Sequence, residues 1–115
     1  MYDVLTATIM RQDDLSRLSR GRDIPVGFDR KVPVSLQFLT DLQENDIRQY
    51  DFLDYAEDIL ILHGTADELV PMDAAAAFCE AQLIEFIPID GADHRFRHSR
   101  AMDQAIKSIL SFFAL

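Results

Sequence analysis

The order of hydrophobic and polar positions is clearest in the second half of the chain, where it predicts a strand, a loop and a helix. Residues 59–62 form a continuous apolar run, which is typical of a strand buried on both faces of a parallel sheet. A polar loop follows, and Pro71 is well placed to begin a helix that we expect over residues 72–80. The loop carries Asp67, which should therefore lie at the carboxyl end of the strand, where ligands and catalytic groups collect in open α/β sheets.

A second strand and a final helix follow in the same half of the chain. Residues 83–89 form another short, mostly apolar run, in which Glu85 and Pro88 indicate a strand nearer the edge of the sheet. Ser99 is a suitable cap for the helix after it. That helix has a wide apolar stripe, which we expect to lie on the sheet and which is formed by Met102, Ala105, Ile106, Ile109, Leu110 and Phe113.

The beginning of the chain predicts shorter elements. Residues 4–10 mix β-branched and apolar side chains, and they fit either a strand, which we favour, or the start of a helix. A short helix capped by Asp13 or Asp14 should follow and should end at Gly21.

Extended chain and a further helix are expected next. Residues 24–34 should form extended pieces around a turn at residues 27–31, and Pro25 and Pro33 keep these pieces out of a central sheet. Apolar side chains then recur with helical spacing, which predicts a helix over residues 34–44.

The composition limits the classes of function. The chain has 115 residues, 49% of them hydrophobic, which is enough for one small domain over residues 1–115. Twenty acidic residues against eleven basic ones give a net charge of −9, so no basic surplus is available for a nucleic acid or an anionic membrane. Cys79 is the only cysteine, which excludes an internal disulfide and a cysteine zinc site. The single thiol fits a reducing compartment, and no leader peptide or apolar run of membrane length is found, so we expect a cytoplasmic protein.

Two motifs around the predicted strands carry a family resemblance. The segment that ends the first strand matches H-G-x-x-D-x-x-V-P at His63, Gly64, Asp67, Val70 and Pro71. After the second strand, residues 91–94 match G-x-x-H, which ends at His94. In this order the two motifs resemble the α/β-hydrolase family, in which the first carries the acid of a Ser-His-acid triad and the second carries its histidine.

The resemblance implies an α/β fold for the chain. We expect a partial α/β-hydrolase-like layer structure with a short parallel sheet, flanking helices and a cap-like N-terminal segment. Residues 59–115 would be the C-terminal strand-helix-strand-helix unit of that fold, and residues 1–58 would be the cap-like or connecting segment. His63 ends a buried strand and is interpreted as structural.

The same resemblance implies roles for two side chains. Asp67 would orient His94, and His94 would act as general base and then as general acid. Asp90 and Asp93 also neighbour His94 in the sequence and are alternatives for the acid, although the family order favours Asp67. His94 and His98 have a helix-like spacing, but no third ligand is evident, so we expect neither a metal site nor a cofactor.

The sequence does not contain the nucleophile that such a triad needs. The family places its serine in a G-x-S-x-G elbow between a strand and a helix. The serines lack the flanking glycines and do not follow a buried strand: Ser16, Ser19, Ser35, Ser99, Ser108 and Ser111. Cys79 lies in the predicted alanine-rich helix, the wrong context for an elbow. We therefore expect the C-terminal fragment of a hydrolase that cleaves an ester or amide bond, with the acid and the histidine but without the serine.

Two kinds of partner would complete such a fragment: a separate N-terminal half that carries the serine, or a second copy in a homo-oligomer. The strand at residues 59–62 would otherwise leave an apolar edge unpaired, which proteins seldom tolerate. The alternative function is a non-catalytic truncated domain that acts through self-association or partner binding. An unrelated small binding domain ranks third.

Overall fold

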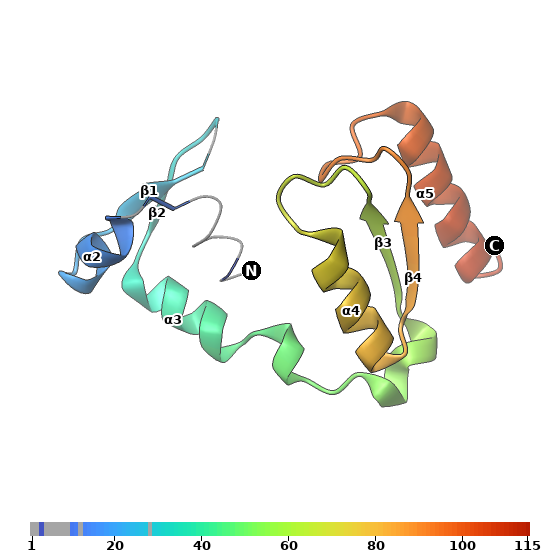
Figure 1. Ribbon diagram of the computed structural model, residues 1–115, viewed down its shortest axis with the longest axis horizontal. Helices are drawn as coiled ribbons and strands as arrows, with labels where there is room; N and C mark the ends of the chain where they lie inside the picture. Colours follow the sequence, from blue (N-terminus) through green and yellow to red (C-terminus); the bar gives the residue numbers. More distant parts are fainter. Residues whose placement is uncertain (1–2, 4–9, 12, 28) are drawn as a thin grey trace. The chain divides into compact units, whose positions relative to one another are not determined.

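The computed structural model of the protein describes residues 3, 10–11, 13–27 and 29–115. The contacts divide the chain into two compact units, Met1–Tyr50 and Asp51–Leu115. Helices and a two-stranded sheet are found in each unit (Figure 1), so the mixed α/β class expected from the sequence is confirmed. The strand or helix expected at residues 4–10 falls, apart from Met10, outside the described residues.

The first unit is a hairpin with a helix on each side of it in the sequence. The described elements are α2 (Asp14–Ser19), β1 (Ile24–Val26), β2 (Val32–Val34), α3 (Leu36–Glu44) and the 3-10 helix η2 (Ile47–Gln49). Strands β1 and β2 pair antiparallel around the predicted turn. Gly21 follows α2 with φ of +77°, as expected for a residue that ends a helix. Ser35 caps α3, because its side chain accepts a hydrogen bond from the Phe38 amide.

The second unit contains the candidate motifs. It consists of the 3-10 helix η3 (Leu53–Asp58), β3 (Leu60–Gly64), α4 (Met72–Gln82), β4 (Glu85–Ile89) and α5 (Ser99–Phe112). Strands β3 and β4 are parallel, and Figure 1 shows their arrows pointing the same way, with the following loops at the same end of the pair. This arrangement confirms the predicted order of strand, helix, strand and helix.

The strand ends differ from those expected. The first strand was expected at residues 59–62, but β3 starts one residue later and continues through His63 to Gly64, which pair with Pro88 and Ile89. The second strand begins two residues late, since Leu83 has a left-handed backbone (φ of +58°) as the residue that ends α4. A residue in this conformation cannot be part of a strand.

The two helices of the second unit cover opposite faces of the parallel strands. Successive residues of a strand point to opposite faces. Ile61 and Phe86 pack with Cys79 of α4, whereas the next residues, Leu62 and Ile87, pack with Ala101 of α5, in a cluster that includes Ile89 and Ala92. Each face of the strand pair therefore has its own small apolar core.

Helix α5 begins at Ser99, the residue predicted as its cap. Ser99 is the first helical residue, and His98 occupies the capping position without a side-chain hydrogen bond to the helix. The first backbone hydrogen bond of the helix runs from the Met102 amide to the His98 carbonyl, so the prediction of Ser99 as the cap was wrong. Within the described part of the chain, no helix combines the length and the hydropathy needed to cross a membrane.

Candidate active site

The loops that follow β3 and β4 are joined by backbone and hydroxyl hydrogen bonds. The Thr65 amide donates to the Ile89 carbonyl (3.1 Å), which continues the strand ladder by one step, and the Ala66 amide donates to the Ala92 carbonyl (2.9 Å). The Thr65 hydroxyl accepts from the Gly91 amide (2.8 Å). These three bonds hold the segment before Asp67 against the segment before His94.

Gly64 allows the two loops to approach this closely. A Cβ atom at this position would lie 2.1 Å from the carbonyl oxygen of Ala92 and 2.7 Å from its carbonyl carbon. Both atoms belong to the backbone, so no side-chain rotation could relieve the contact. The glycine of the H-G motif is therefore required by the close approach of the two backbones, because glycine alone has no Cβ.

The acid and the histidine predicted from the motifs are in direct contact. Nδ1 of His94 lies 2.9 Å from Oδ2 of Asp67, so the predicted hydrogen-bond contact is present. A carboxylate only accepts hydrogen bonds, so Nδ1 carries the proton. The other ring nitrogen, Nε2, is left with a lone pair, and the His94 side chain is 40% exposed. An imidazole oriented in this way can accept a proton from a group that approaches from solvent.

The remaining partners of Asp67 fix its carboxylate in place. Oδ1 accepts from the backbone amides of Leu69 and Val70, each at 2.9 Å, and the side chain is only 6% exposed. Burial raises the pKa of Asp67, but the hydrogen bonds from Val70, His94 and Leu69 outweigh burial, so this pKa lies below its ordinary value. The carboxylate is therefore ionised at neutral pH and can stabilise a positive charge on His94.

The two alternative acids, Asp90 and Asp93, do not form a hydrogen bond to the His94 ring. The carboxylate of Asp93 accepts from the Arg97 amide (3.0 Å) and pairs with the Arg97 guanidinium, and these interactions lower the pKa of Asp93. Asp90 is exposed and makes no hydrogen bond to any described residue. Of the three aspartates considered, only Asp67 contacts His94.

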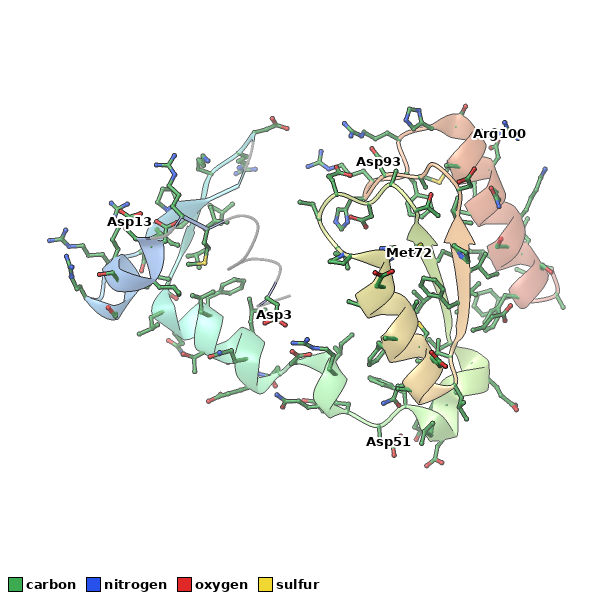
Figure 2. All side chains as sticks on the ribbon, in the orientation of Figure 1. Asp3, Asp13, Asp51, Met72, Asp93 and Arg100 are labelled. Carbon is green, nitrogen blue, oxygen red and sulfur yellow. The ribbon has the colours of Figure 1, made fainter. Side chains whose placement is uncertain are left out.

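Asp93 supports the site indirectly. It is the residue before His94, and its carboxylate closes the turn of residues 93–97, together with a backbone bond from Phe96 to the Asp93 carbonyl. Figure 2 labels Asp93 and Arg100, which lie on either side of the short segment at residues 94–99. The buried Asp93 thus helps to set the path of the backbone that carries the histidine.

The contacts made by Thr65, Gly91 and Ala92 were not predicted from the sequence, although Gly91 begins the G-x-x-H motif. The Thr65 hydroxyl accepts a hydrogen bond from the Gly91 amide, and the Ala92 carbonyl accepts one from the Ala66 amide. Only the occurrence of small residues immediately after both predicted strands could have indicated such a close approach.

None of the described hydroxyl or thiol groups bonds to Nε2 of His94. The described serines are in helices or at their starts, as in Ser35, which caps α3, and Ser108, which donates to the Gln104 carbonyl inside α5. Cys79 is buried in α4, and burial raises the pKa of its thiol, which disfavours the reactive thiolate.

The described residues contain no group of three histidine, cysteine or acidic side chains placed to hold a metal ion. A scan against protein-family models and a search of curated proteins each found no match to this chain. The resemblance to α/β-hydrolases therefore stays a prediction that depends on the two motifs and on the contact between Asp67 and His94.

Proposed function

We propose that this chain is the C-terminal part of an α/β-hydrolase and supplies the acid and the histidine of a Ser-His-acid triad. The observation that carries this proposal is the 2.9 Å contact between Nδ1 of His94 and Oδ2 of Asp67 at the carboxyl ends of parallel strands. The location agrees with the rule that functional groups of open α/β sheets collect at that end. The helices on both faces of β3 and β4 would be part of the layers of the complete fold.

The proposed reaction is the hydrolysis of an ester or amide bond through an acyl-enzyme. Nε2 of His94 would take the proton of a serine as the serine attacks the carbonyl carbon, and would then donate that proton to the leaving group. Asp67 would keep its negative charge throughout, hold the ring in the Nδ1–H tautomer and stabilise the imidazolium. In the second half of the reaction, His94 would activate water in the same way. This chemistry requires no cofactor.

The serine would come from a separate N-terminal half of the enzyme. Strand β3 pairs only with β4 among the described residues, so its other edge can accept a further strand. Its side chains Leu60, Ile61 and Leu62 are half-buried, and a neighbouring strand with its own layers would bury them further. The serine elbow and the oxyanion hole would then be contributed by that half.

The isolated chain should show no turnover of p-nitrophenyl acetate beyond the rate that a free imidazole gives, because it has no serine elbow. A steady-state assay should give the same rate for the wild type and for His94→Ala after correction for free imidazole. A fluorophosphonate probe should label no serine. Turnover well above that background, together with a labelled serine that requires His94, would show that the chain carries its own nucleophile.

The proposal itself is tested with the reading frame encoded immediately upstream of this chain. We expect a G-x-S-x-G sequence there, and co-expression of that polypeptide with this chain should give an esterase that the fluorophosphonate probe labels. If no such sequence lies upstream, or if the combined polypeptides stay inactive, the hydrolase proposal is contradicted.

The second candidate function is a non-catalytic domain that acts through self-association. The observation in its favour is the exposed face of α5. The helix packs on the strands through the small residue Ala101, and Ala105 is also buried. Large apolar side chains are left 42% to 62% exposed at Met102, Ile106, Ile109 and Leu110 of the helix and at Phe113 directly after it. An apolar patch of this kind often marks a protein–protein interface.

Self-association predicts a homodimer or larger oligomer at micromolar concentration, measured by size-exclusion chromatography with light scattering. Ile106→Glu combined with Ile109→Glu should convert it to a monomer, because each change places a charge in the interface. Leu36→Glu is the matched control, since Leu36 is a similarly exposed apolar residue, 48% accessible, on α3 of the other unit. A monomeric wild-type protein would rule this candidate out.

A further inference from the structure

His63 is a buried ionisable group to which the triad chemistry gives no task. It is 8% exposed, and its side chain lies on the α4 face of β3, where its ring is 6.1 Å from the ring of Phe86. One edge of the imidazole faces the loop that follows the strand, and this loop carries Asp67.

The ring nitrogen Nε2 of His63 has two oxygen atoms near it. It lies 3.0 Å from the carbonyl oxygen of Val70 and 3.6 Å from Oδ2 of Asp67. The first distance is that of a hydrogen bond and the second is too long for one. Because a carbonyl oxygen only accepts, Nε2 of His63 must carry a proton and direct it to Val70.

These contacts form a chain of hydrogen bonds that passes through one residue, Val70. The Val70 carbonyl accepts from His63, while the Val70 amide donates to Oδ1 of Asp67. The same aspartate receives His94 on Oδ2. Fixing the position of Val70 therefore helps to fix the rotation of the Asp67 carboxylate, and with it the direction in which Oδ2 points.

The Val70 carbonyl also determines which histidine forms a hydrogen bond to Oδ2 of Asp67, because it accepts the proton of His63. Two imidazoles lie near that oxygen, His94 at 2.9 Å and His63 at 3.6 Å. If the proton on His63 were not bonded to Val70, Oδ2 of Asp67, 3.6 Å from Nε2, would be the alternative acceptor. A second donor on Oδ2 would compete with His94 and weaken its tautomer preference.

We propose that His63 is a positioning residue of the Asp67–His94 pair: its Nε2–H bond to Val70 orients the carboxylate and reserves Oδ2 for His94. This inference rests on the proposed function, because the Asp67–His94 pair has a catalytic role only if the chain is part of a hydrolase. A purely structural role would instead make His63 a contributor to folding, with no influence on the tautomer of His94 in the folded protein.

Three substitutions separate these roles. His63→Gln keeps an N–H donor at nearly the position of Nε2, whereas the shorter His63→Asn cannot reach the Val70 carbonyl. His63→Phe keeps an aromatic ring next to Phe86 but removes the donor. His98→Gln, at an exposed residue outside this network, assigns the remaining histidine signals and serves as the control.

The measurement is the nitrogen-15 NMR spectrum of the imidazole rings, recorded on the whole chain at neutral pH. In the wild type we expect His63 as the Nε2–H tautomer and His94 as the Nδ1–H tautomer. The Nδ1–H fraction of His94 should fall about twofold or more in folded His63→Asn and His63→Phe, because the bond on one nitrogen sets which one holds the proton. It should be retained in His63→Gln and in His98→Gln.

An Nδ1–H tautomer at His63 in the wild type would overturn the inference, since such a ring cannot donate from Nε2 to Val70. An unchanged His94 tautomer in folded His63→Asn would overturn it as well. Should His63→Phe fail to fold, the wild-type tautomer of His63 and the comparison of His63→Asn with His63→Gln still decide. Failure of the proposed function would give a different result. The chain combined with the upstream polypeptide would show no turnover, while the tautomers of His63 and His94 would be as expected.

Discussion

Replacing Gly64 with alanine is expected to lower the melting temperature of the Asp51–Leu115 unit by more than about 10 °C and to separate Asp67 from His94. The added Cβ would lie 2.1 Å from the Ala92 carbonyl oxygen, so one of the two loops must move. Forcing an extra methyl group into a packed site costs about 1–3 kcal/mol, and the upper end applies here because the contact is with backbone atoms. Each kcal/mol lowers the melting temperature of a small domain by roughly 4–8 °C. The displaced carbonyl would also lose its bond from Ala66.

The matched control for this substitution is Gly91→Ala. Gly91 lies in the loop after β4 and has φ of +71°, but a Cβ there would meet nothing within 4 Å. Gly91→Ala should lower the free energy of unfolding by about 1 kcal/mol only, the strain of an alanine in a left-handed backbone conformation. Thermal unfolding followed through the amide NMR signals of β3 and β4 measures both. Equal melting temperatures for Gly64→Ala and the wild type would contradict the close approach of the loops.

In the hydrolase completed by its N-terminal half, Asp67→Asn is expected to lower kcat about 10⁴-fold, the size of effect seen when a triad acid becomes an amide. An asparagine can donate from its amide nitrogen, so His94 would turn to the tautomer with its proton on Nε2, where it cannot accept the proton of a serine. The carboxylate that stabilises the imidazolium would also be lost. His94→Ala should be at least as severe, because the general base is removed.

The control for this loss is Asp90→Asn. Asp90 is an exposed carboxylate at the start of the loop that carries His94, and it has no contact with the ring. The substitution removes the same charge from the chain and should leave kcat within about twofold, since surface changes outside a site have small effects. Steady-state kinetics on an activated ester compares the variants. A similar loss in Asp90→Asn and Asp67→Asn would contradict the assignment of Asp67 as the acid.

Much of the fold follows from local patterns in the sequence. The helices over residues 36–44, 72–82 and 99–112 agree with the predicted helical stripes to within two residues, except that the final one starts without its expected cap. The extended pieces around a turn at residues 27–31 and the strand-loop-helix order around Asp67 were also predicted. Periodicity and turn residues act between near neighbours in the chain, so they can be read without the rest of the molecule.

The strand ends were decided by pairing between strands. His63 and Gly64 resemble a loop in the sequence, because a polar side chain and a glycine follow four apolar residues. They are in β3 because β4 continues opposite them as Pro88 and Ile89. A strand extends as far as it has a partner, and the partner lies more than twenty residues further along the chain.

The identity of the acid was likewise predicted in part from the sequence and settled by a tertiary contact. The motifs selected Asp67 and His94, but the residues alone left Asp90 and Asp93 open as alternatives. Asp93 is adjacent to His94 in sequence, yet its carboxylate turns to Arg97, whereas Asp67, 27 residues away, reaches the ring. The sequence by itself determined the elements and the candidate residues. The tertiary structure decided their contacts, because parallel pairing brings the ends of two distant strands together and small residues at Gly64 and Ala92 let the loops meet.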